Sequence, residues 1–178
     1  ENADCGFITD NAQLDVCPDC GAMLFPVGES DILGDEWTEL GNQALDRGDP
    51  ALAARRFQRA ADLNDPYGMT NLGWCYEVGQ GTERAPERAV QYYRKAAELG
   101  YHPALCNLGI CLLNGIGTPV DEAGALQCIR TSAEGGVPRA QHLLGDFYSA
   151  GRLVPRDEGR AVQWYQSAAW LGYPPAQT

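Results

Sequence analysis

Residues 72–100 read LGWCYEVGQGTERAPERAVQYYRKAAELG, and their pattern recurs along the chain at a spacing of 36 residues. The Leu-Gly pair at its start has later copies at 108–109 and 144–145, and an earlier copy at 40–41, only 32 residues upstream. Three further columns keep the spacing of 36 over four copies: Ala53, Ala89, Ala125 and Ala161; Phe57, Tyr93, Ile129 and Tyr165; Ala60, Ala96, Ser132 and Ala168. A fixed period of this length is typical of repeat proteins, whose stacked units share a continuous core.

Each copy has the apolar spacing of two α-helices. In the second copy, apolar residues from Leu72 to Tyr76 and from Ala89 to Ala96 recur at steps of three and four, as on one helical face. Gly79-Gln80-Gly81 predicts the end of the first helix, because glycine tolerates left-handed backbone angles. Such a hairpin cannot bury its apolar stripe alone, so the units must stack. The sequence therefore predicts an all-α, right-handed α/α superhelical solenoid of about four two-helix repeats, with units near 35–66, 67–102, 103–138 and 139–174.

The repeat pattern resembles that of a known family. Ala-x-x-x-Leu-Gly, then Gly-x-Gly, then Asp-x-x-x-Ala-x-x-Tyr/Trp-Tyr-x-x-Ala-Ala is similar to the Sel1-like repeat, and the similarity covers about residues 35–178. The first unit is shorter, since Leu40 to Ala60 spans 20 residues and Leu72 to Ala96 spans 24. That shorter unit resembles a tetratricopeptide repeat, a structural relative. The resemblance implies a solenoid that binds a protein or peptide along the first helix of each unit, which we call helix A; the second is helix B.

The charge distribution separates an N-terminal segment from the repeats. The net charge is −11, and residues 1–50 hold twelve acidic side chains and one basic side chain, Arg47. Without a basic stripe, we expect no nucleic-acid partner. The sequence contains no run of 18 apolar residues, so we expect no membrane span. The first residues lack the basic and apolar regions of a secretory signal, so we expect a cytoplasmic protein unless a leader was removed.

Residues 1–30 carry a cysteine motif typical of metal sites. Cys17-Pro18-Asp19-Cys20-Gly21 spaces two thiolates for one metal ion, and Cys5-Gly6-Phe7 resembles the end of the other knuckle of a zinc ribbon or rubredoxin. Asn2 stands where that knuckle would carry its second cysteine, so only three thiolates remain for a site that needs four ligands. One interpretation is zinc held by Cys5, Cys17 and Cys20 with Asp4, Asp19 or the terminal amine as the fourth ligand. The others are a metal-free knuckle and a disulfide or redox pair at positions 17 and 20.

The remaining cysteines and the histidines do not predict catalysis. Cys75, Cys106, Cys111 and Cys128 fall within the repeats, and we expect them in the core. Secreted Sel1-like proteins described as β-lactamase-like carry cysteine pairs that join helix B to the next helix A. Cys106 matches one half of such a pair, but Ala97 occupies the other position. His142 and Asp146 can share a helix face, yet no motif places a nucleophile with them. We therefore expect no enzyme and disfavour a hydrolase.

Helix A residues outside the packing columns should point into the trough of the solenoid. They are Thr38, Asn42, Thr70, Trp74, Glu77, Ile110, His142 and Asp146, together with Cys106 and Ser149. Trp74 is the sharpest candidate, because its sister residues Ile110 and Asp146 show that packing requires no aromatic ring there. It either anchors a partner or packs against the N-terminal segment. Asn42 could bind a peptide backbone. The leading hypothesis is a scaffold or adaptor that binds a protein segment; the alternative is a zinc-dependent regulatory or assembly module.

Overall fold

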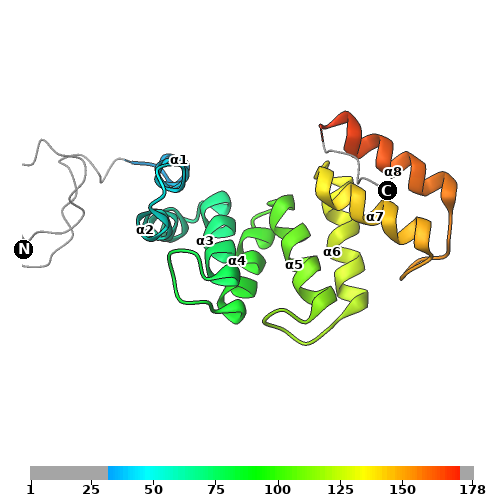
Figure 1. Ribbon diagram of the computed structural model, residues 1–178, viewed down its shortest axis with the longest axis horizontal. Coiled ribbons are helices and arrows are strands. Elements are labelled where there is room, and N and C mark those ends of the chain that lie inside the picture. Colours follow the sequence, from blue (N-terminus) through cyan, green and yellow to red (C-terminus); the bar gives the residue numbers. More distant parts are fainter. Residues whose placement is uncertain (1–31, 173–178) are drawn as a thin grey trace, which may run out of the picture. The chain divides into compact units, whose positions relative to one another are not determined.

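The computed structural model describes residues 32–172, and this part of the chain forms eight α-helices and no strand (Figure 1). The N-terminal segment with the candidate zinc ligands Cys5, Cys17 and Cys20 lies outside the described residues, as do residues 173–178. The helices are α1 (Gly34–Asp46), α2 (Pro50–Asp62), α3 (Pro66–Val78), α4 (Pro86–Glu98), α5 (His102–Asn114), α6 (Glu122–Glu134), α7 (Pro138–Ala150) and α8 (Glu158–Trp170). Odd-numbered helices are A and even-numbered helices are B, which confirms the all-α solenoid.

Local sequence fixes where the helices begin and end. Asp121 and Asp157 are the N-caps of α6 and α8, since each carboxylate accepts a backbone N–H from the first turn of its helix. The predicted glycine stop at Gly79 is confirmed, and Gly115 and Gly151 end their helices A in the same way; the three φ angles are left-handed, at 80°, 68° and 66°. Each described helix is 13 residues long, and none of them is long and apolar enough to cross a bilayer.

The connection between helices A and B accounts for the short first unit. Three residues join α1 to α2, whereas seven residues join α3 to α4, and the difference equals the four missing residues. In the longer loops Gly81 and Gly117 have left-handed φ angles and lie against helix B of the preceding unit. A Cβ atom would come within 1.9 Å of the Pro50 carbonyl oxygen at Gly81, and within 2.2 Å of that of Pro86 at Gly117. The second glycine of the Gly-x-Gly motif therefore allows the loop backbone to pack closely against helix B of the preceding unit.

The two helices of a hairpin pack through the Leu-Gly glycine. The buried ring of Tyr93 on α4 passes beside Gly73 on α3, where a Cβ atom would lie 2.7 Å from its Cε1 atom. Gly109 receives Ile129 and Gly145 receives Tyr165 in the same way. The glycine therefore lets the two helices approach closely, and the column that begins at Phe57 fills the centre of each hairpin.

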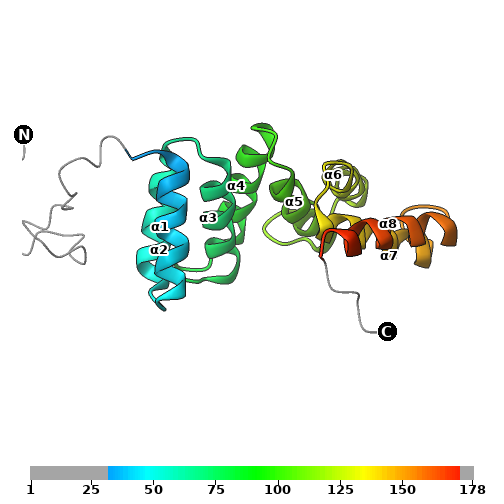
Figure 2. The ribbon, with the colours of Figure 1, turned by 90° about the horizontal axis from the view of Figure 1, so that it is seen from above.

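Successive hairpins stack through helix B of one unit and helix A of the next, as α2 on α3, α4 on α5 and α6 on α7. Helices A also touch one another, because α3 contacts both α1 and α5; no two helices B make a comparable contact in the described region. A stack in which only the A helices approach one another curves toward them. Figure 2 shows the α1–α2 hairpin beside α3 at the start of this series.

Candidate functional site

Helix A side chains that do not pack between units form a strip across the four repeats. We call this strip the A surface; its members are Glu39, Asn42, Asn71, Trp74, Glu77, Asn107, Ile110, Arg139, His142 and Asp146. Each of these side chains is exposed or half-buried. Six of them, Asn42, Trp74, Glu77, Ile110, His142 and Asp146, also belong to the set predicted from sequence.

Amide side chains link neighbouring units along the A surface. The Nδ2 atom of Asn71 donates to the Oδ1 atom of Asn42 over 3.2 Å, and Nη1 of Arg139 donates to Oδ1 of Asn107 over 3.3 Å. Sequence reasoning found Asn42 but missed Asn71, Asn107 and Arg139. The sequence did contain a pattern that could have identified Asn71 and Asn107, because an asparagine stands immediately before Leu-Gly in these two consecutive copies.

Two carboxylates of the A surface are held by tyrosines that come from helix B. The buried Tyr93 donates its hydroxyl to Oε2 of Glu77 over 2.7 Å, and Tyr165 donates to Oδ1 of Asp146 over 2.8 Å. Burial, and then the hydrogen bond to the carboxylate, raise the pKa of both phenols above the ordinary value. Both hydroxyls therefore keep their protons and fix the carboxylates in place at neutral pH. Nδ1 of His142 lies 3.3 Å from the other Asp146 oxygen.

Trp74 keeps 38% of its surface exposed between these polar groups. It follows Asn71 by three residues and precedes Glu77 by three residues, so each of these two side chains is its neighbour on the surface of α3. Ile110 on α5 occupies the equivalent position and is half-buried. The alternative that Trp74 packs against residues 1–30 lies outside the described part of the chain. An exposed indole among hydrogen-bonding groups is typical of an anchor for a partner.

Three residues expected in the trough do not reach it. Thr38 is only 1% exposed and donates its hydroxyl to Oδ2 of Asp65 over 2.5 Å. Thr70 is 7% exposed and bonds the Pro66 carbonyl of its own helix, and Cys106 is also buried. Thr38 lies against the start of the next helix A, beside Gly68 of α3, and the pattern within one unit could not show such a contact. The structure thus corrects the expectation for Thr38, Thr70 and Cys106, whereas His142, at the equivalent position of the fourth unit, keeps some exposure.

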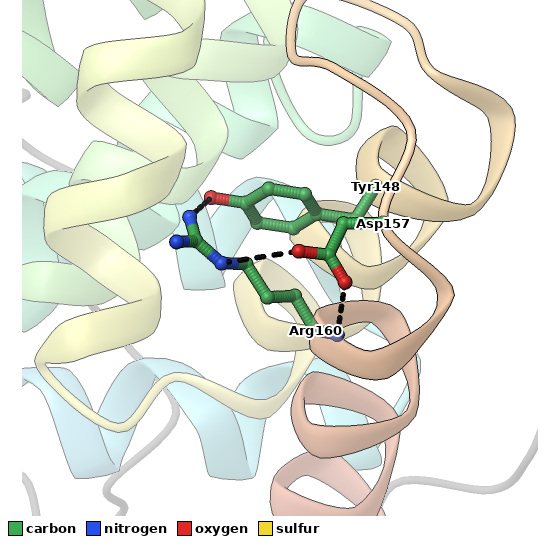
Figure 3. Close-up of polar contacts among 3 residues, drawn as sticks. All are labelled: Tyr148, Asp157 and Arg160. Atoms are coloured by element: carbon green, nitrogen blue, oxygen red, sulfur yellow. Dashed lines mark hydrogen bonds and ion pairs between the residues drawn. The ribbon is translucent and has the colours of Figure 1, made fainter.

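Arginine and tyrosine side chains tie helix A to helix B on the opposite side of the hairpins. Figure 3 shows Arg160, whose Nη1 lies 3.2 Å from the Tyr148 hydroxyl and whose Nε lies 3.4 Å from Oδ2 of Asp157. The backbone N–H of Asp157 in turn donates to the Tyr148 carbonyl and closes the loop. Arg88 covers the ring of Tyr76 at 4.1 Å in the second unit. Because these groups satisfy one another within a hairpin, we assign them a structural role.

The described cysteines are core residues, as expected. Cys75, Cys106 and Cys111 are buried, Cys128 is half-buried, and all four are free thiols. Burial raises the pKa of Cys75 and Cys106 to about 11 and that of Cys111 to about 12, so these thiols are protonated and weakly nucleophilic at neutral pH. No group of three or more possible metal ligands occurs within residues 32–172. The chemistry that the A surface offers is therefore hydrogen bonding, charge and aromatic contact.

Comparison with known proteins identifies the repeat. The Sel1 repeat model matches residues 33–65, 66–101, 102–137 and 138–173, so it includes the short first unit that we compared with a tetratricopeptide repeat. A search of curated proteins gives no match. Solved structures with similar folds include a protective antigen of uropathogenic Escherichia coli with an SLR fold (34% identity, TM-score 0.70) and a Sel1 repeat protein of Oxalobacter formigenes (31% identity, TM-score 0.69). Helicobacter pylori cysteine rich protein B shares the fold at 24% identity, with a TM-score of 0.50, over 60% of this chain and 86% of its own.

The first two matches cover 78% of this chain but only part of the other proteins. The chain spans 31% of the E. coli antigen and 58% of the Oxalobacter protein. Four consecutive matches to one family model nonetheless cover the whole described region except for residue 32. The chain belongs to the Sel1 repeat family.

Proposed function

We propose that this chain is a scaffold or adaptor that holds a segment of another protein on the A surface. Sel1 repeat proteins generally mediate protein–protein interactions. The observation that carries the proposal is Trp74, a large aromatic side chain that stays 38% exposed on α3 although the equivalent positions hold Ile110 and Asp146. Exposed tryptophans contribute strongly to interfaces, because they bury a large area and lose little side-chain entropy on binding.

The groups around Trp74 suit the backbone of an extended segment. In the Asn71–Asn42 bond, one amide uses a donor and the other uses an acceptor. The Asn42 NH₂ group and the Asn71 carbonyl have no hydrogen-bond partner among the described residues. Together they can accept a peptide N–H and donate to a peptide C=O. Trp74, one turn along α3 from Asn71, would then cover a side chain of the same segment.

A selection from a displayed library of random peptides tests the proposal. The immobilised full chain is used as bait, and the affinities of enriched peptides are measured by fluorescence anisotropy. We expect Trp74→Ala and Asn42→Ala to weaken binding about tenfold each, which is typical of hot-spot residues. Trp170→Ala is the matched control, because Trp170 is 90% exposed on helix B and its removal should leave binding unchanged.

Two outcomes contradict the proposal. One is that no peptide is enriched. The other is that enriched peptides bind Trp74→Ala and Asn42→Ala as tightly as the original chain, which would move the binding site away from the A surface.

The zinc-dependent alternative depends on residues 1–30 and stays a prediction. It requires that Cys17→Ser and Cys20→Ser abolish partner binding while the helical circular dichroism signal is retained. In the scaffold hypothesis, the same changes leave binding to the A surface intact. The cytoplasmic location and the absence of a nucleic-acid partner also stay predictions.

A further inference from the structure

The two types of helix carry opposite charge. Helices A hold six acidic side chains and one basic side chain, Arg139, in the described region. Helices B hold eight basic and six acidic side chains there. Three of the six acidic side chains, Glu39, Glu77 and Asp146, belong to the A surface, and they outnumber its one arginine, so the A surface itself is acidic. An acidic surface attracts cationic partners and repels anionic ones.

Two acidic groups of the A surface are held in place by tyrosine hydroxyls from helix B. The buried Tyr93 and the half-buried Tyr165 occur in the two units whose helices A carry an acceptor within reach, Glu77 and Asp146. In the other two units the same column has Phe57 and Ile129, which have no hydroxyl. Helix A of those units has no carboxylate at the positions equivalent to Glu77 and Asp146. A carboxylate with one oxygen fixed loses less conformational freedom when its other oxygen binds a cation.

Trp74 and Glu77 together form a site suited to a lysine or arginine side chain. They are three residues apart on α3, so the indole and the carboxylate are neighbours on one helix face. A cation over an indole ring is stabilised by the ring quadrupole, and the carboxylate supplies the opposite charge. Only Oε2 of Glu77 bonds Tyr93, which leaves Oε1 for a ligand.

We propose that the protein segment bound by the A surface is cationic, with a lysine or arginine side chain seated between Trp74 and Glu77. This inference rests on the proposed function and adds the chemistry of the partner. The one basic group on helices A, Arg139, is held by Asn107 and opposes such a partner. Removal of the Arg139 charge should therefore strengthen the binding of a cationic segment, and the direction of the change in affinity tests the inference.

The test uses the peptides enriched from the displayed library, with the full chain as bait. We expect an excess of lysine and arginine over aspartate and glutamate in the enriched sequences. Raising the salt from about 0.01 M to about 0.15 M shortens the Debye length from about 30 Å to about 8 Å, and should weaken binding about tenfold. Glu77→Gln should weaken binding about tenfold as well, because the amide still accepts from Tyr93 but has no charge. Arg139→Gln should tighten binding a few-fold.

Glu98→Gln is the matched control, since Glu98 is an exposed carboxylate on helix B. If enriched peptides are neutral or acidic, or if Arg139→Gln weakens their binding, the cationic inference is overturned while dependence on Trp74 leaves the proposed function standing. If cationic peptides bind equally well to Trp74→Ala and Glu77→Gln, or respond equally to Glu98→Gln, the A surface is not the site and both proposals fail.

Discussion

Replacement of Gly73 by alanine tests the packing that builds the A surface. In an open helix, Gly→Ala stabilises by up to about 1 kcal/mol, because alanine has the higher helix propensity. Here the added Cβ atom would lie 2.7 Å from Cε1 of Tyr93 and 3.3 Å from the Ala89 carbonyl oxygen. Ordinary carbon–carbon contacts are about 3.5–4.0 Å, so the overlap with the ring is roughly 1 Å. The ring is fully buried and its hydroxyl is bonded to Glu77, so it has little room to move.

Overpacking of a well-packed core costs about 1–3 kcal/mol, and the propensity gain offsets up to about 1 kcal/mol of it. Gly73→Ala should therefore lower the free energy of unfolding by about 0–2 kcal/mol, and by about 1–3 kcal/mol relative to a Gly→Ala change without a clash. Urea denaturation followed by far-UV circular dichroism measures it. The control is Gly159→Ala in the first turn of α8, where the nearest atom outside the helix backbone, an Asp157 carboxylate oxygen, is an ordinary 3.4 Å away. That variant should be as stable as the original chain or up to about 1 kcal/mol more stable. If Gly73→Ala is as stable as Gly159→Ala, the ring does not fill the hairpin as described and the reasoning fails.

Four further predictions concern the loops, the tyrosine column, the thiols and the N-terminal segment. Gly117→Ala should destabilise by about 2–3 kcal/mol in urea denaturation, because φ is 64° and the Cβ atom meets a neighbouring carbonyl; an unchanged midpoint contradicts the loop contact. Tyr93→Phe should cost about 1.5–3 kcal/mol by the same assay, because the charged hydrogen bond to Glu77 is lost. The pKa of Cys111 is about 12 in the folded chain and about 9 ordinarily, so the unfolded thiol ionises first. Stability should be intact below pH 9 and fall by up to about 1.4 kcal/mol per pH unit as pH rises toward 12, and Cys111→Ala should reduce that slope. Elemental analysis should find about one zinc per chain, lost in Cys17→Ser, if the cysteine motif binds metal.

The hairpins could be predicted from the sequence alone because their geometry requires glycine at positions where few other residues fit. A ring can pass close to helix A only where the facing residue is glycine, and a left-handed helix stop favours glycine too. Gly73 and Gly79 therefore recur at the period of the fold. The units could be aligned from these positions without knowledge of any contact between them.

The site could be predicted only in part, because it depends on contacts between units. Thr38 and Thr70 looked available when a single hairpin was considered, but both are buried in the stack of units. The bond from Tyr93 to Glu77 was missed for a related reason. A buried column predicts a large side chain, but it does not predict on which side of helix A the hydroxyl emerges. Arg139 was missed because it contacts Asn107 of the preceding unit, 32 residues away.

The tyrosine column also offers a route for engineering. Its side chains start on helix B and reach the underside of the A surface. A substitution at a buried position of this column can therefore change the groups that a ligand contacts on the A surface. Ile129 is the natural place to try this, because its unit has neither the hydroxyl nor the acid. Ile129→Tyr combined with Leu113→Glu would copy the arrangement of the second unit into the third. The tyrosine-held carboxylate could then be repeated in successive units of the solenoid, with Trp74 left unchanged.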